Sequence, residues 1–558
     1  MTFTGARTAR FASITARAHR AGTFLLLLGA SVASTHAACT SFGESPASPD
    51  AAVVEPVDAS VPPAEDATVV QVTPNLTLTP SAEIRRGDSL KVDFSVAAPP
   101  DVPLVGNIVA GPKPIVAGIT VRNVIFDAKT GKGSFEIVTA PTTKTAPANL
   151  EVWLQGPRSS NRANLKLDVL GRPGELDESF GTGGTVIEVS PPRGMDVGSA
   201  NVDATGALYL AGQNNGVPTI RKYTAAGIVD TMFGKSGEVT LDGYNGRLTG
   251  IHARPDGKLA IGVNGTTPRG FNGYTRGTVS GSGAFDARTF ETDIDCSILG
   301  AFRATAFTLH VCSGATSWYV LTPDFAGSVS APNWGSPSQG YASGDDMTIK
   351  DYIEGPNFGF ALGEGPIAGT FVAVRLTRNG LIDTAFGTNG RVVIQFPTEV
   401  YAFRYYGSAF DDAGNVYVAG STQSQDGEVV VFRFSSTTGV LDATYGFARI
   451  TKTPDISIKT ELSPRAFVRT SDGFYVMGTA TGLSGWTFLL SRLDLAGNID
   501  RGFGTAGALR LRVAPPTSNH QLGAALFDTP PHKLTLVGYH RNNASSDTRG
   551  ISLARIWR

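Results

Sequence analysis

The sequence has few sulfur-containing residues and almost no net charge. It holds 3 cysteines and 5 methionines in 558 residues, and its formal net charge at pH 7 is −1. Such a charge balance excludes the strongly basic surface typical of nucleic-acid-binding proteins, so we expect no nucleic acid as a partner. The 66 glycines and 33 prolines, with scarce methionine, instead favour an all-β chain with many turns, and the length predicts two or more domains.

Motifs for catalysis or metal binding are also missing. The sequence lacks His-Glu-x-x-His, Gly-x-Ser-x-Gly, a phosphate-binding glycine-rich loop and Cys-x-x-Cys. Asp345, Asp346 and Asp351 cluster in the sequence and are a candidate for cation binding. No catalytic residue, no metal ligand and no cofactor is assigned from these patterns.

The apolar run near the N-terminus is too short to span a bilayer as a stable helix. Four arginines between residues 7 and 20 precede the apolar residues 23–30, and small residues follow up to Ala38. This order is typical of a secretory signal, so residues 1–38 are predicted to be a signal peptide. Retention of the run as a membrane span is an alternative.

Cys39 follows two alanines directly. Ala37-Ala38-Cys39 resembles the end of a bacterial lipoprotein signal, although His36 stands where such signals usually carry leucine. The resemblance implies lipidation of Cys39 and a membrane partner, with the protein in the cell envelope, at the outer membrane or cell surface. Ordinary cleavage near Ala38 would instead give a secreted protein.

Residues 39–70 are rich in proline, alanine and acidic residues. Residues 40–70 contain no lysine or arginine, so their carboxylates repel one another without compensation. Such a segment cannot bury a core and is predicted to be an extended tether.

Residues 71–171 show short segments of alternating apolar and polar residues. The predicted strands lie at 76–79, 90–96, 119–126, 134–138, 150–154 and 165–170. Six or more short strands in about 100 residues predict a β-sandwich. The pattern is similar to immunoglobulin-like modules, without their Cys-Trp-Cys signature, and a spacer role is expected.

Residues 172–558 contain a repeated element that reads Leu-Asp-x-x-Phe-Gly-x-x-Gly. The clear copies begin at Leu176, Val229, Ile382, Leu441 and Ile499. An Asp-Gly-type hairpin turn, a strand that ends in glycine and a strand with a basic residue accompany the copies. Weaker copies are expected at Phe285-Asp286 and Trp334-Gly335. Seven glycine-ended strands predict a seven-bladed β-propeller.

This element is similar to the delta-60 repeat of bacterial secreted proteins. The resemblance covers residues 172–558 and implies a propeller in the style of the NHL repeats. It carries no catalytic residues with it. We expect the repeated aspartates to cap turns rather than to bind metal. They are Asp177, Asp230, Asp383, Asp442 and Asp500.

The strand order places the repeated turns on one face of the propeller and the variable loops on the opposite face. Variable loops on a rigid scaffold are common binding sites. The candidate ligand-binding residues are Tyr244, Arg247, Arg404, Tyr405, Tyr406, His520 and His540. Their rings and donors suit a glycan or a protein ligand, although the aromatic residues could instead pack the edges of the blades.

The favoured function is that of a non-enzymatic binding or interaction protein. The alternatives are a propeller enzyme, such as a lyase or hydrolase acting on polysaccharide, and a purely structural surface protein.

Two long-range pairings follow from the repeat pattern. Cys296 and Cys312 are equidistant from a predicted turn near Ala304, so we expect them to lie opposite each other and to form a disulfide. In the expected four-stranded blades, residues 185–189 would be a fourth strand whose first three strands are missing. Residues 551–556 would be a third strand with no fourth strand after it. We expect these two strands to pair and to close the ring, because unpaired strand edges are avoided.

Overall fold

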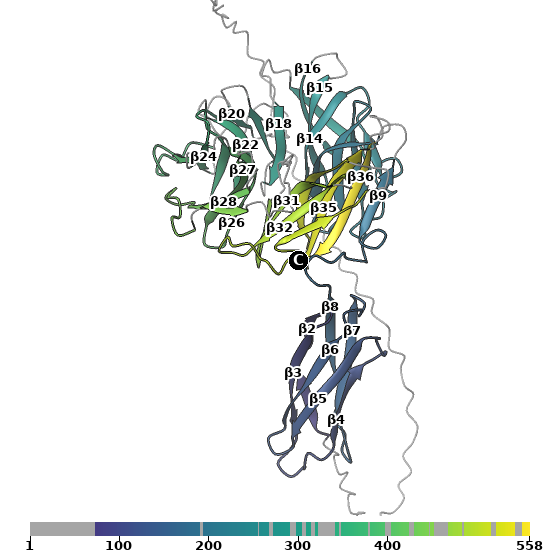
Figure 1. The fold of residues 1–558 in the computed structure, drawn as a ribbon. Coiled ribbons are helices and arrows are strands. Elements are labelled where there is room, and N and C mark those ends of the chain that lie inside the picture. The colour runs from purple at the N-terminus through teal and green to yellow at the C-terminus, as the bar shows by residue number, and fades with distance from the viewer. Residues whose placement is uncertain are drawn as a thin grey trace, which may run out of the picture. The chain divides into compact units, whose positions relative to one another are not determined.

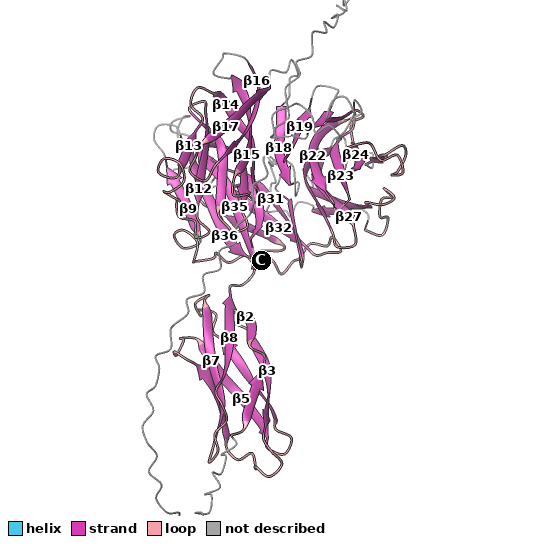
Figure 2. Cartoon of the chain, turned by 180° about the vertical axis from the view of Figure 1, so that it is seen from behind, coloured by secondary structure: helices cyan, strands magenta, loops and turns pink. Residues whose placement is uncertain are grey.

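The computed structural model describes the chain from residue 73 onward, with interruptions. The residues not described are 1–72, 190–193, 255, 267–271, 291–296, 304–307, 314–317, 322–340, 345–346, 356, 378–379, 397–402, 423–428, 446, 451–466, 483–484, 515–519, 530 and 542–548. All regular elements of the described residues are β-strands (Figure 2). This part of the chain contains no helix long and apolar enough to cross a membrane. The predicted signal peptide, the tether and Cys39 lie outside the described residues.

The first eight strands form two four-stranded sheets. One sheet has the order β1 (Asn75–Leu78), β3 (Ser89–Ala97), β6 (Lys132–Thr139), β5 (Ile119–Asp127). The other has the order β2 (Ser81–Arg85), β8 (Ala163–Leu170), β7 (Pro147–Gln155), β4 (Asn107–Pro112). β2 and β8 run parallel, and the other neighbours run antiparallel.

A single apolar core lies between these two sheets. Phe94 and Phe135 come from one sheet, Leu150 and Leu165 from the other, and all four are buried in one cluster. β3 alternates strictly between exposed and buried residues beyond Lys91, because successive side chains of a strand point to opposite faces. The predicted sandwich architecture and its six predicted strands are present, and β2 and β4 are additions to it.

The remaining strands form seven further four-stranded sheets, which we number sheets 1 to 7. Sheet 1 consists of β10 (Asp196–Val202), β11 (Leu208–Asn214), β12 (Val217–Tyr223) and β13 (Glu238–Thr240). Sheet 2 consists of β14 (Asn245–Ala253), β15 (Leu259–Thr266), β16 (Asn272–Val279) and β17 (Phe285–Phe290). Sheet 3 consists of β18 (Ser297–Arg303), β19 (Thr308–Ser313), β20 (Trp318–Leu321) and β21 (Tyr341–Gly344). Sheet 4 consists of β22 (Thr348–Glu354), β23 (Phe358–Glu364), β24 (Thr370–Thr377) and β25 (Arg391–Gln395). Sheet 5 consists of β26 (Phe403–Phe410), β27 (Asn415–Thr422), β28 (Val429–Ser435) and β29 (Phe447–Ile450). Sheet 6 consists of β30 (Phe467–Thr470), β31 (Gly473–Gly482), β32 (Gly485–Leu493) and β33 (Ala508–Leu511). Sheet 7 consists of β34 (His520–Thr529), β35 (Lys533–Arg541), β36 (Arg549–Trp557) and β9 (Thr185–Val189).

Sheet 7 differs from the others because its fourth strand comes from far upstream. β9 pairs antiparallel with β36, with Val186 opposite Leu553 and Glu188 opposite Ile551 (Figure 1). The predicted pairing of residues 185–189 with residues 551–556 is therefore confirmed. Without β9, the outer edge of β36 would be unpaired.

The first strands of the seven sheets contact one another in sequence. β10 contacts β14, and the contacts continue through β18, β22, β26 and β30 to β34, which in turn contacts β10. Described side chains of neighbouring sheets also share apolar cores, such as Phe360 and Phe432 from sheets 4 and 5. In β27, Val418 faces sheet 4 while Tyr417 faces sheet 6. Burial on both faces explains why such strands are almost continuously apolar.

Candidate functional site

The repeated aspartate has two structural contacts in each clear copy of the element. One carboxylate oxygen accepts a hydrogen bond from the backbone N–H two residues later, as Asp230 Oδ1 does from Met232 N at 3.2 Å. The other oxygen forms an ion pair with a basic residue of the sheet's third strand. These ion pairs are Asp177–Arg555, Asp230–Lys222, Asp383–Arg375, Asp442–Arg433 and Asp500–Arg492.

The same cations lie over aromatic rings of their sheets. Arg555 lies 4.7 Å from the ring centroid of Phe180, and Arg375 lies 4.9 Å from that of Phe386. In four of the five copies the basic residue of the third strand thus joins the aspartate to the aromatic residue of the element, and in the fifth Arg492 lies over Tyr475 of β31.

The turn that precedes the aspartate in one sheet covers the element of the preceding sheet. Gly181 N donates to Ala226 O at 2.7 Å, and Arg375 Nη1 donates to Ser436 O at 2.7 Å. Gly227 has a φ of +75°, and a Cβ there would lie 2.7 Å from the Phe180 ring. The repeated element therefore joins neighbouring sheets, which supports the structural role predicted for its aspartates. The hydrogen bond from Lys222 lowers the pKa of Asp230.

A second repeated feature is a β-bulge in the first strand of a sheet. Six of the seven first strands have a register shift in their pairing with the second strand. In sheet 4, for example, Ile349 pairs with Gly363, Lys350 is the extra residue, and Asp351 pairs with Leu362. A Cβ on Gly363 would lie 2.4 Å from Thr348 O, so the close backbone approach explains the glycine at the end of this second strand.

Two residues that flank the bulges depart from the pattern of the other sheets. Five of the residues directly before the bulges are aliphatic or glycine: Val197, Leu248, Ile298, Ile349 and Gly523. Five of the residues directly after them are small: Ser199, Gly250, Ala301, Gly407 and Ala525. The exceptions are Tyr405 before the bulge of sheet 5 and Asp351 after the bulge of sheet 4.

These two exceptions contact each other. The Tyr405 hydroxyl donates a hydrogen bond of 2.6 Å to Asp351 Oδ2 and lies 2.8 Å from Ser408 Oγ. Tyr405 is 5% exposed and Asp351 8% exposed. A buried carboxylate is unfavourable unless it is hydrogen-bonded, so the Tyr405 hydroxyl satisfies Asp351 and joins β22 to β26.

The polar contacts continue toward the end of β23. Tyr405 N donates to Glu364 Oε1 at 3.2 Å, and Lys350 Nζ lies 3.2 Å from Glu364 Oε2. Lys350 and Glu364 are both partly exposed. We define the candidate site as Lys350, Asp351, Glu364, Arg404 and Tyr405.

The structure corrects the placement of two predicted ligand residues. Tyr405 and Tyr406 lie in β26 and are buried, with Tyr406 packed in a core with Tyr417 and Phe474. They are buried strand residues and not loop residues that could stack on a ligand. Arg404, between Phe403 and Tyr405, is exposed.

Arg247 occupies the same position in sheet 2 as Arg404 does in sheet 5. Each arginine lies two residues before the extra residue of the bulge, and each is exposed. Arg247 Nη2 lies 3.4 Å from Val197 O of sheet 1. Among the described residues, no carboxylate forms an ion pair with Arg247 or Arg404.

The other predicted ligand residues do not join this site. Tyr244 is partly buried and packs edge-to-face on Phe285, with ring centroids 5.8 Å apart. His540 lies in β35, not in a loop; it is 2% exposed, and its Nδ1 lies 2.8 Å from Ser552 Oγ. His520 pairs through its backbone with Arg541, and its side chain lies outside the description.

The register of sheet 3 corrects the predicted opposition of the two cysteines. Cys312 lies opposite Ile298, because the pairing of β18 with β19 is centred one to two residues later than predicted. Cys296 is outside the described residues, so the disulfide stays a prediction.

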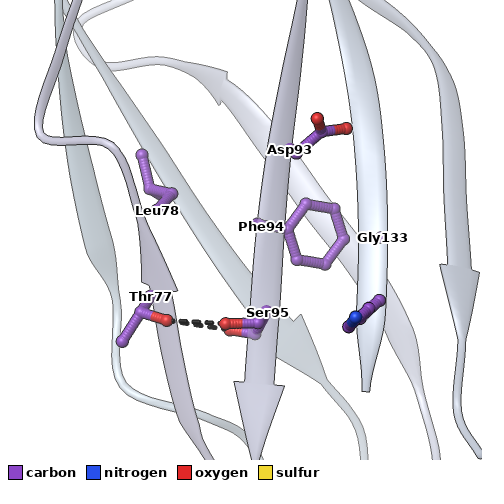
Figure 3. A pocket seen from close by; sticks show the side chains of 7 residues that line it. Thr77, Leu78, Asp93, Phe94, Ser95 and Gly133 are labelled. Carbon is purple, nitrogen blue, oxygen red and sulfur yellow. Dashed lines mark hydrogen bonds between the residues drawn. The ribbon is translucent and has the colours of Figure 1, made fainter. Parts of the chain in front are cut away.

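A shallow hollow of about 520 Å³ lies on the N-terminal sheets, at β1, β3 and β6. Its lining includes Leu78, Phe94 and Gly133, and Thr77 hydrogen-bonds Ser95 at its edge (Figure 3). The nearby Asp93 side chain is 79% exposed. The hollow thus combines an apolar floor with a solvated rim, and we do not include it in the candidate site.

No group of three or more potential metal-ligating His, Cys, Asp or Glu residues occurs in the described part of the chain. Asp345 and Asp346, two members of the predicted cation cluster, are not described, and Asp351 is bonded to Tyr405. In comparisons with known proteins, no family model matches this chain, and no curated protein matches it.

Proposed function

We propose that the chain is a non-enzymatic binding protein of the bacterial cell envelope. In this proposal sheets 1 to 7 are the blades of a seven-bladed β-propeller of the delta-60 type. The two N-terminal sheets are an immunoglobulin-like spacer, and a lipid on Cys39 anchors the chain to a membrane.

The propeller proposal is supported by the order of contacts between first strands. That order returns from β34 to β10, and β9 completes the last sheet. Apolar cores shared between neighbouring sheets fit the packing of propeller blades.

One observation supports binding above all. The repeated aspartates and their cations brace the scaffold at the ends of the strands where the repeated turns lie. At the opposite ends of the first strands, Arg247 and Arg404 are exposed at equivalent positions. A braced scaffold with exposed polar groups at one end suits recognition.

The test is a screen of the purified chain on glycan and peptide arrays. We expect a ligand whose signal decreases when Arg404 is replaced by alanine and persists in Lys235→Ala, which removes an exposed cation from a repeated turn. The absence of any ligand in both arrays would contradict the binding function.

Lipidation is tested by labelling cells with radioactive palmitate. We expect label in the wild-type chain and none in Cys39→Ala. Equal labelling of the two chains would reject the anchor.

A further inference from the structure

We propose that Arg247 and Arg404 bind carboxylate groups of an acidic polysaccharide. This inference rests on the proposed binding function and names the chemical class of its ligand.

The positions of the two arginines are set by the bulges. Each arginine precedes the bulge of a first strand by the same number of residues, so both lie toward the same end of their strands. Sheets 3 and 4 separate them in one direction, and sheets 6, 7 and 1 separate them in the other. In the proposed ring they therefore lie on opposite sides of the centre, where an extended ligand can contact both.

The chemistry of the two arginines themselves favours an anion. Arg404 has no ion-pair partner among the described residues, whereas Lys350 is neutralised by Glu364. A guanidinium group presents two parallel N–H donors that match a carboxylate. A ligand with repeated acid groups can therefore pair with both arginines, whereas a ligand with a single charge can pair with only one.

The neighbouring residues favour a saccharide over an apolar peptide. Asn245 and Thr348, near the starts of β14 and β22, are at least partly exposed and offer hydrogen-bonding groups for sugar hydroxyls. None of the exposed large hydrophobic residues of the described chain lies on a first strand. Apolar peptide side chains would therefore find no exposed large hydrophobic residue on the described first strands themselves.

The buried pair positions Arg404. Tyr405 is its neighbour in β26 and is fixed to β22 by the 2.6 Å hydrogen bond to Asp351 and to β23 by the bond from its backbone N–H to Glu364. A group held by such contacts loses little freedom on binding, which raises affinity.

The test is a calorimetric titration of the purified full chain with oligogalacturonate, with its methyl ester as the neutral control and poly-glutamate as the acidic peptide. Arg247→Ala and Arg404→Ala are each expected to weaken oligogalacturonate binding by roughly tenfold or more, because each removes charge-assisted hydrogen bonds. Lys235→Ala, the matched removal of an exposed cation elsewhere, is expected to bind like the wild type. The methyl ester is expected to bind far more weakly than the acid.

Equal binding of the ester, unchanged affinity in both arginine variants, or tighter binding of poly-glutamate would overturn the inference. The inference would also be overturned if the wild-type chain did not bind oligogalacturonate but bound another ligand on the arrays. The proposed binding function would then stand. A wild-type chain that binds nothing in the titrations or on the arrays would contradict both.

Discussion

Arg555 Nε donates a hydrogen bond of 2.6 Å to Asp177 Oδ2, although the two residues are 378 positions apart in the sequence. The contact joins β36 to the first copy of the repeated element. Lys533 Nζ lies 2.9 Å from the same oxygen, and Asp177 is completely buried. Burial acts to raise the pKa of Asp177, but hydrogen bonds from Ser179 and Lys533 and the charge of Arg555 outweigh it and lower the pKa.

The first prediction concerns this buried carboxylate. Asp177→Asn leaves two cations without their anion and is expected to destabilise the chain by roughly 3–5 kcal/mol. Asp230→Asn is the matched control, because its side chain is 21% exposed and pairs with one lysine; we expect a loss of about 1 kcal/mol. Calorimetric melting of the two variants measures the difference. Equal losses would mean that the contact of Asp177 with Arg555 and Lys533 is no stronger than the ion pair of Asp230.

The sign of the pH effect at Asp177 follows from its lowered pKa. The folded chain holds this carboxylate ionised at pH values where the unfolded chain protonates it. Its contribution to stability is therefore present above the unfolded pKa and is lost as the pH falls through the folded pKa.

The second prediction concerns the buried hydrogen bond between sheets 4 and 5. Tyr405→Phe removes the hydroxyl that bonds Asp351 and is expected to destabilise the chain by about 1–3 kcal/mol. The double variant Tyr405→Phe with Asp351→Ser also removes the buried carboxylate, gives that position the residue type of Ser199 in sheet 1, and keeps the ring that packs in the apolar core. We expect it to be more stable than Tyr405→Phe and to bind the ligand more weakly than the wild type does.

Melting curves and titrations of the same variants check this prediction. A double variant that is the least stable of the set would show that the pair is needed for folding. A double variant with unchanged ligand affinity would remove the pair from the binding site.

The third prediction concerns His540, whose pKa is lowered by burial. The unfolded residue titrates near a pKa of about 6.5. Stability is therefore expected to decrease as the pH falls below about 6.5, by up to about 1.4 kcal/mol per pH unit, until the folded pKa is reached. His540→Gln should flatten this part of the profile, because it removes the buried titrating group. An identical slope in the variant and in the wild type would contradict the assignment.

Periodic features of the sequence predicted much of the repeat region. The pairing of residues 185–189 with residues 551–556 followed from counting strands, because an incomplete first and last unit must complement each other. The turn-capping role of the aspartates followed from residue type. The ion pairs with the third strand were missed, although a basic residue recurs there, since only the fold places that strand beside the turn.

Features that depend on a single residue of register were not predictable from the sequence. The register of β18 with β19 places Cys312 opposite Ile298, and Tyr405 lies within β26 and not in a loop, because strand ends and register depend on pairing that the residue pattern alone does not determine. In sheet 2 the expected weak copy of the element is absent. A tight turn at residues 280–284 joins β16 to β17, and Phe285 and Asp286 begin β17.

The sequence contains a signal for the buried pair of Asp351 and Tyr405 that the prediction did not use. Aligned on the bulges, five of the six positions after the bulge hold small residues, and aspartate is the exception. β2 and β4 were missed because each is short and lies next to proline or glycine, which usually indicate turns.

Amide hydrogen exchange across β9 is the most direct test of the proposed closed arrangement of the seven sheets. If residues 185–189 complete sheet 7, their amides should exchange as slowly as those of residues 550–554 of β36, their partners in the register. Fast exchange of residues 185–189 in a chain whose β36 stays protected would contradict the closure and would leave sheet 7 with three strands.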